Sequence, residues 1–200
     1  MPTHAFPYLM SRLVLARVIS IVGHPVLVLP LAVMVSGRER GVSMATRSTT
    51  IGVTVGIGVV VLVFSAVRVW LGHWKHVDAS EPAERNQLNG FTAVLLFGAA
   101  LAGFLTSGGS PDLYLWPACS GGVVLAAIVL RRRMKLSQHV AFDLFAAIAV
   151  LPSVWAALAL ALLTSGVGWS RLVLQRHTRM EVAVGTVVGV VAGAVFQVAL

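Results

Sequence analysis

The chain has little of what a soluble protein normally carries in quantity. Charged residues make up only 11% of its 200 residues, whereas hydrophobic residues make up 58%. An average soluble domain has about 25% charged residues. A single cysteine, Cys119, excludes a disulfide within the chain and argues against a cysteine-based metal cluster. No Gly-rich phosphate loop of the Walker or Rossmann type is present. The composition therefore indicates an integral membrane protein.

Acidic residues are also scarce, with 7 against 15 lysines and arginines, and the net charge is +8. The basic residues lie in short stretches between apolar runs, which favours contact with anionic lipid headgroups or phosphorylated substrates. We therefore expect membrane lipids as partners and no nucleic acid. The chain length suits one compact helical bundle, so residues 1–200 are interpreted as a single integral membrane domain.

Long apolar runs predict membrane-spanning helices, because a span needs roughly 20 apolar residues. The runs lie at about 18–36, 51–71, 91–107, 115–130 and 183–199. The first, about Val18–Val35, is too long for a signal peptide and is interpreted as the first span. The predicted fold is an all-α, polytopic transmembrane bundle.

The apolar stretch 139–169 decides the predicted topology, because Pro152 lies near its middle. Proline bends or breaks a helix, so the stretch forms either one kinked helix or a hairpin of two short helices. A hairpin places His139 and His177 on the same side of the membrane, whereas a single crossing separates them. We favour the hairpin, which gives about six to seven helical segments.

Glycines recur every four residues in two of the predicted spans. They are Gly52 and Gly56 in the second span and Gly185, Gly189 and Gly193 in the last. Such spacing lets membrane helices approach each other closely. We expect these glycines to serve packing rather than catalysis.

The most informative polar cluster is Ser170-Arg171, followed by His177 and then by Glu181. Charges near lipid are costly unless they are paired or face water. On a helix, residues four apart share a face, so His177 and Glu181 can hydrogen-bond. That pairing fixes the tautomer of the imidazole and makes its other nitrogen a better nucleophile or base. Arg171 offers a planar set of donors that suits phosphate. The cluster predicts an anion-processing site at the membrane surface.

Other charged residues and histidines are interpreted without a catalytic role or with an alternative to one. Arg176 and Arg179 are interpreted as interfacial anchors, and His24 as a structural residue. Asp143 lies one helical turn after His139, so the two side chains can pair. Asp143 also allows the hypothesis of a small channel or a proton-linked carrier.

A third polar stretch, residues 72–90, carries charges of both signs. Lys75 and Arg85 either hold phosphate oxygens or belong to a charged loop with local salt bridges. The nearby carboxylates are expected to pair with those cations when no substrate is bound; they belong to Asp78, Glu81 and Glu84.

Together the three clusters resemble the type 2 phosphatidic acid phosphatase superfamily, the membrane lipid phosphatases related to vanadium haloperoxidases. The third motif of that family is Ser-Arg, five residues, His, three residues and Asp. Here Ser170, Arg171 and His177 match it, with Glu181 in the place of the aspartate. The resemblance covers about residues 72–199.

The other two family motifs match less closely. Of the Pro-Ser-Gly-His motif, Ser137 and His139 are present, while leucine and glutamine replace the proline and glycine. In the first motif, Lys75 and Arg85 are further apart than usual, and Lys135 supplies a further cation near the second motif.

The resemblance implies a metal-independent, two-step phosphoryl transfer that needs no cofactor. His177 would attack phosphorus and form a phosphohistidine, with Glu181 orienting its ring. His139 would protonate the leaving oxygen and then activate water. The implied phosphate-binding set is Arg171, Lys75, Arg85, Lys135, Ser137 and Ser170.

We therefore expect a cell-membrane phosphatase that hydrolyses a lipid phosphate or diphosphate, such as phosphatidic acid, phosphatidylglycerol phosphate or a polyprenyl diphosphate. The departures at Gln138 and Glu181 leave open a non-catalytic lipid-binding or transport protein derived from the same fold. The membrane face of the site and assembly into a homo-oligomer also stay open.

Overall fold

The computed structural model describes residues 5–106 and 110–200, and these residues form eight α-helices and no β-strand. The helices are α1 (Ala5–Val22), α2 (Pro25–Glu39), α3 (Met44–Trp70), α4 (Pro82–Thr106), α5 (Pro111–Leu130), α6 (Gln138–Ala149), α7 (Val154–Val173) and α8 (Arg179–Ala199). The predicted all-α class is confirmed.

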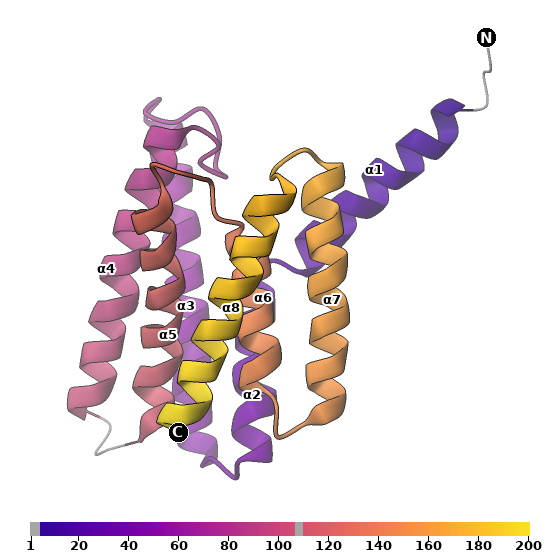
Figure 1. Cartoon of the computed structure of the whole chain (residues 1–200). Coiled ribbons are helices and arrows are strands. Elements are labelled where there is room, and N and C mark those ends of the chain that lie inside the picture. Colours follow the sequence, from indigo (N-terminus) through magenta and orange to yellow (C-terminus); the bar gives the residue numbers. More distant parts are fainter. Residues whose placement is uncertain (1–4, 107–109) are drawn as a thin grey trace.

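From α2 to α8 the helices run alternately down and up the bundle (Figure 1). Five of them are long and apolar enough to cross a membrane, and the bent pair α1–α2 brings the number to as many as six. The chain is therefore a multi-pass membrane protein. Because of this alternation, the connections α3–α4, α5–α6 and α7–α8 all lie at the upper end of the bundle in Figure 1.

The first predicted span is not one straight helix but two helices, so the prediction of a single span is corrected here and the bundle has one more helix than expected. The run Val18–Val35 breaks at Gly23-His24, where α1 and α2 meet at a bend of 48°. Pro25 causes the break, since a residue before proline disfavours the helical conformation and proline has no N–H to donate. His24 caps the new helix, as its Nδ1 accepts from the Val26 amide at 3.3 Å. In Figure 1, α1 extends away from the bundle.

The predicted hairpin is confirmed, because α6 ends at Ala149 and α7 begins at Val154. The turn between them contains Pro152, which does not continue α6. The hairpin is asymmetric, since α6 has 12 residues and α7 has 20. The connection from α5 descends from the upper end to reach the start of the shorter α6 (Figure 1). His139, in the first turn of α6, therefore lies below the upper end of the bundle.

Two polar stretches are more helical than predicted. Helix α3 begins at Met44, where the Ser43 hydroxyl accepts from the Thr46 amide at 3.1 Å. Helix α4 begins at Pro82, which is a favourable first helical residue because its missing N–H has no intrahelical partner. Arg85 therefore lies on a helix rather than in the predicted polar connection.

The short helix α6 is the centre of the core. Phe145 is fully buried and packs with Trp116 of α5 and Phe196 of α8, with ring centroids 5.4 and 5.7 Å away. Trp116 and Phe196 are themselves 4.8 Å apart. These three rings join α5, α6 and α8.

The glycines of α8 pack as predicted, against α6. A Cβ atom added at Gly185 would lie 2.7 Å from the Ser137 carbonyl oxygen, and one at Gly189 would lie 2.6 Å from the Ala141 carbonyl oxygen. A Cβ at Gly193 would lie 2.6 Å from an Ile148 side-chain carbon. The prediction for α3 is wrong, because a Cβ at Gly52 or Gly56 would meet nothing within 4 Å.

This contrast gives a stability prediction. Gly189→Ala is expected to destabilise the bundle by about 1–3 kcal/mol, because the new methyl group forces α8 away from α6. Gly52→Ala is the matched control, and it should leave stability unchanged or raise it by about 0.5–1 kcal/mol. Thermal unfolding of both variants in one detergent measures the difference. Equal melting temperatures would show that the α6–α8 contact does not need glycine.

Candidate functional site

A pocket of about 710 Å³ opens at the upper end of the bundle, where the connections meet. We call it the basic pocket. Five basic side chains line it, those of Arg17, Arg85, Lys135, Arg171 and Arg176. Among the described residues, Asp78 supplies the only carboxylate of the lining. The pocket therefore has a strong excess of positive charge.

Both predicted imidazoles line the basic pocket. His139 enters from the start of α6 and His177 from the α7–α8 connection. Both histidines reach the same pocket because the α6–α7 hairpin returns the chain to the end of the bundle from which α6 starts. The two histidines are therefore not separated by the thickness of the membrane.

A third imidazole, that of His24, lies beside them. The sequence indicated only a structural residue at this position and did not reveal that His24 lies next to the other two histidines. Its ring centroid is 5.0 Å from that of His139, in an edge-to-face arrangement. His24 also lines the basic pocket, in addition to capping α2. The signal was the Gly23-His24-Pro25 sequence, which breaks the first apolar run and turns the chain inward.

The spacing between Arg171 and His177 has a local cause. Helix α7 ends at Val173, and the backbone N–H groups of Arg176 and His177 both donate to the Arg171 carbonyl, at 2.9 and 3.3 Å. Gln175 takes a positive φ of 53° within this turn. The five intervening residues thus let the chain fold back over the end of α7.

The His177 ring is held by its Nδ1 atom. Nδ1 lies 3.2 Å from the Lys135 carbonyl oxygen and 3.4 Å from Oε2 of Glu181. Both neighbours are acceptors, so Nδ1 carries the proton in the neutral ring and Nε2 keeps its lone pair. The side chain is only 4% exposed. The geometry therefore leaves Nε2 as a buried nucleophile or base.

The predicted pairing of His177 with Glu181 is confirmed, although His177 lies before the helix rather than on it. Helix α8 begins with a capping box, in which Thr178 and Glu181 bind each other's backbone N–H groups. Oε1 of Glu181 also accepts from the Lys135 amide at 3.0 Å. Glu181 therefore joins the α5–α6 and α7–α8 connections.

The environment at the upper end of the bundle lowers the pKa values of two pocket residues, His177 and Lys135. Burial lowers the pKa of His177, and the Arg171 and Lys135 cations lower it further, more than Glu181 raises it. The imidazole is therefore neutral near pH 7, as a nucleophile must be. Burial also lowers the pKa of Lys135, and the neighbouring Arg85 and Arg171 act in the same direction.

Two guanidinium groups of the pocket are only partly satisfied. Arg171 donates from Nη1 to the Ser20 hydroxyl at 2.9 Å, and Arg85 donates from Nη2 to the Ser80 carbonyl at 3.1 Å. The Nε atom of each is buried without a hydrogen-bond partner among the described residues. An unpaired buried donor is costly, particularly on a charged group. These donors and the surrounding charge suit an anion.

Arg176, interpreted from the sequence as an interfacial anchor, lines the pocket. Its Nη1 donates to Oδ2 of Asp78 at 2.5 Å and to the Ser80 hydroxyl at 3.4 Å. Burial acts to raise the pKa of Asp78, but hydrogen bonds from Ser80 and Arg176 hold that pKa below its usual value. The α3–α4 connection is thereby attached to the α7–α8 connection.

Three members of the predicted phosphate-binding set do not reach the pocket. Lys75 is 72% exposed and pairs with Glu81 at 3.3 Å, because the α3–α4 connection directs its side chain outward. Ser170 is fully buried, and its hydroxyl donates to the Val167 carbonyl at 2.8 Å. Ser137 is fully buried where α6 meets Gly185, outside the pocket lining.

The remaining carboxylates also differ from expectation. Glu84 accepts from the backbone amide of Lys75 at 2.8 Å rather than holding the side chain of a cation. Asp143 is fully buried, and neither of its oxygens has a hydrogen-bond partner among the described residues. The predicted pair with His139 is therefore absent.

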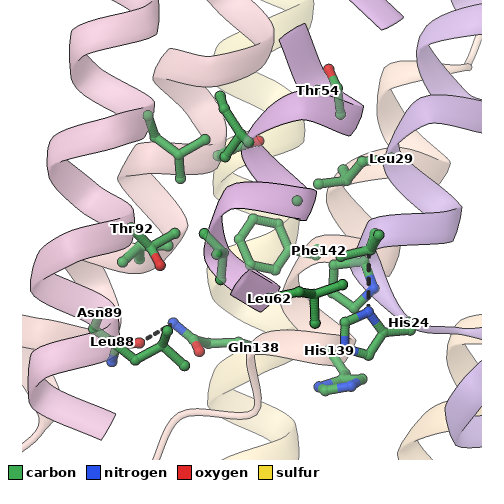
Figure 2. Close-up of a pocket in the computed structure, with 18 of the residues that line it drawn as sticks. His24, Leu29, Thr54, Leu62, Leu88, Asn89, Thr92, Gln138, His139 and Phe142 are labelled. Atoms are coloured by element: carbon green, nitrogen blue, oxygen red, sulfur yellow. Dashed lines mark hydrogen bonds between the residues drawn. The ribbon is translucent and has the colours of Figure 1, made fainter. Parts of the chain in front are cut away.

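Gln138 lines the pocket next to His139. Its Nε2 donates to Oδ1 of Asn89 on α4 at 3.2 Å (Figure 2). The amide is thus turned toward α4.

Within residues 5–106 and 110–200, no three His, Cys, Asp or Glu side chains are grouped so as to hold a metal ion. Comparisons with protein-family models, with curated proteins and with solved structures find no match for the chain.

Proposed function

We propose that the protein is a phosphatase of the cell membrane that hydrolyses a lipid phosphate or diphosphate through a phosphohistidine. One observation carries the proposal. Arg85 and Arg171, each with an unpaired Nε–H, line the same pocket as His177, whose Nδ1 is held by acceptors so that Nε2 keeps its lone pair. An anion-binding surface and a neutral nucleophile are the two elements that phosphoryl transfer requires.

In the first step, Nε2 of His177 attacks phosphorus and the bond to the leaving oxygen breaks. His139 protonates that oxygen. Burial and the Arg171 cation lower the pKa of His139, and the negative charge of the bound phosphate acts in the opposite direction and favours the protonated imidazole. In the second step, neutral His139 takes a proton from water, and the resulting hydroxide attacks phosphorus. Inorganic phosphate leaves, and Nε2 of His177 regains its lone pair.

The other pocket residues act by charge and orientation. Arg85, Lys135 and Arg171 hold the equatorial oxygens, where negative charge is spread in the transition state. Arg176 joins this set and takes the place that the sequence predicted for Lys75. Glu181 orients the ring of His177 and stabilises the positive charge that the imidazole carries once it is phosphorylated.

Phosphate release from purified protein tests the proposal. The substrates are phosphatidic acid, phosphatidylglycerol phosphate and a polyprenyl diphosphate, each in mixed micelles. We expect release from at least one of them, inhibition by vanadate and no loss with a chelator. Vanadate should act because it adopts the five-coordinate geometry of the transfer step beside His177. Release that a chelator abolishes and vanadate spares would contradict this mechanism.

Gln138 supports a second function, that of a lipid-binding or transport protein without turnover. Its side chain, bonded to Asn89, occupies pocket lining where the family motif has glycine. Binding of a lipid phosphate with no phosphate release under any of these conditions would favour this second function.

A further inference from the structure

A second cavity, of about 260 Å³, lies inside the bundle next to the basic pocket. We call it the apolar cavity. Helices α2, α3, α4, α5 and α6 all contribute to its wall. In Figure 2, Leu62 and Phe142 lie in its middle, while His24, His139 and Gln138 lie together at one end. The cavity therefore has its histidines at one end, and its lining elsewhere is mainly apolar with a few hydroxyls, such as those of Thr54 and Thr92.

The apolar cavity runs along the bundle rather than across it. On α3 its lining extends from Ser65 to Val53, which corresponds to about 18 Å of helix. This is more than half of the roughly 30 Å hydrocarbon thickness of a bilayer. The hydroxyl of Thr54, toward the deep end, donates to the Thr50 carbonyl at 2.8 Å. A molecule bound in the cavity therefore needs no polar group to pair with this hydroxyl.

The two cavities adjoin each other. His24, Gln138 and His139 line both of them. For a molecule with its phosphate beside His177, the apolar cavity therefore lies directly beyond His139. The positive charge of the basic pocket and the apolar wall beyond it match the two halves of one amphiphile.

We propose that the apolar cavity binds the hydrocarbon chain of the substrate, and that the substrate is a single-chain lipid phosphate. The headgroup chemistry of this inference rests on the proposed function. An apolar cavity of about 150 Å³ accommodates one benzene, so the space here holds about ten carbon atoms. That amount fits the first part of one alkyl or prenyl chain, whereas two acyl chains exceed it.

Filling the cavity tests the proposal through chain-length selectivity. Thr92 of α4 lines the cavity, and Thr92→Phe places a ring inside it. Val94 is 73% exposed on the same helix, so Val94→Phe is the matched control. With dodecyl phosphate, Thr92→Phe should lower kcat/KM by about 10–100-fold, whereas Val94→Phe should not. With butyl phosphate both variants should match the parent protein. Equal losses of Thr92→Phe on both substrates would overturn the proposal.

Chain selectivity in the parent protein is a further readout. Dodecyl phosphate should be turned over at least about tenfold more efficiently than a phosphatidic acid with two long chains, presented in the same micelles. Equal efficiency on the two substrates would overturn the single-chain inference.

A binding measurement keeps the chain site testable apart from catalysis. Trp116 lines the cavity, so a dodecyl phosphonate with a nitroxide on its chain should quench Trp116 fluorescence. Subtracting the signal of the Trp116→Phe variant assigns the quenching to this indole. Quenching that Thr92→Phe removes and Val94→Phe retains supports the cavity as the chain site, even if no phosphate is released. An unquenched Trp116 in the parent protein overturns it, whatever the phosphatase assay shows.

Discussion

Purified His177→Ala is expected to lose lipid phosphate hydrolysis by at least about 10⁴-fold, because the variant has no nucleophile for the first step. The remaining cations would still bind the headgroup, so dodecyl phosphonate should bind with an affinity close to that of the parent protein. Rates of phosphate release and a binding titration measure the two effects separately. Turnover at the parent rate would remove His177 from the mechanism.

His73→Ala is the matched control for this variant. His73 lies in the α3–α4 connection at the same end of the bundle, is exposed and does not line the basic pocket. Its loss should leave the rate unchanged. A phosphoenzyme trapped from the parent protein should be labile in acid and stable in base, as a phosphoramidate is. A phosphoenzyme of the opposite stability would point to a different nucleophile.

The largest stability effect is expected at the opposite end of α2, where Arg40 binds both carboxylate oxygens of Asp112 on α5. The two side chains are only 17% and 10% exposed. Arg40 also donates to the Ser36 hydroxyl at 3.2 Å and lies 5.5 Å from the ring centroid of Phe196. Asp112→Ala leaves a buried guanidinium without its counter-charge, which typically costs about 3–5 kcal/mol.

Thermal unfolding in detergent measures this effect, and the chain offers two controls. Glu81→Ala removes the exposed partner of Lys75 and should change stability by at most about 1 kcal/mol. The double variant Arg40→Met with Asp112→Leu removes both charges and should be far less destabilised than Asp112→Ala alone. A melting temperature of Asp112→Ala equal to that of Glu81→Ala would show that the pair stabilises little.

Sequence patterns predicted correctly those features that depend on residues close together in the chain. The length of each apolar run indicates a span, and Pro152 inside a 31-residue run indicates the hairpin. The spacing of His177 and Glu181 predicts their contact, although the capping box of α8 and not a shared helix face produces it. In each of these cases the partners are only a few residues apart.

Patterns failed where a partner comes from a distant segment. Lys75 and Arg176 both lie in polar connections, and nothing in their neighbours shows that Arg176 faces the pocket while Lys75 faces solvent. The pairing of Arg176 with Asp78 joins residues 98 positions apart. His24 illustrates the same difficulty, since its neighbour His139 is on a different helix.

The amino-acid sequence by itself determined that this protein is a multi-pass helical bundle, because hydrophobicity and helix-breaking residues act over short distances. Only the tertiary structure decided which cations converge, that the hairpin brings His177 to the same pocket as His139, that His24 adjoins His139, and that an apolar cavity lies next to the basic pocket. Those features depend on which faces of five helices pack together. Helix packing is governed by the complementarity of surfaces far apart in the chain, which the periodicity of a single helix does not encode.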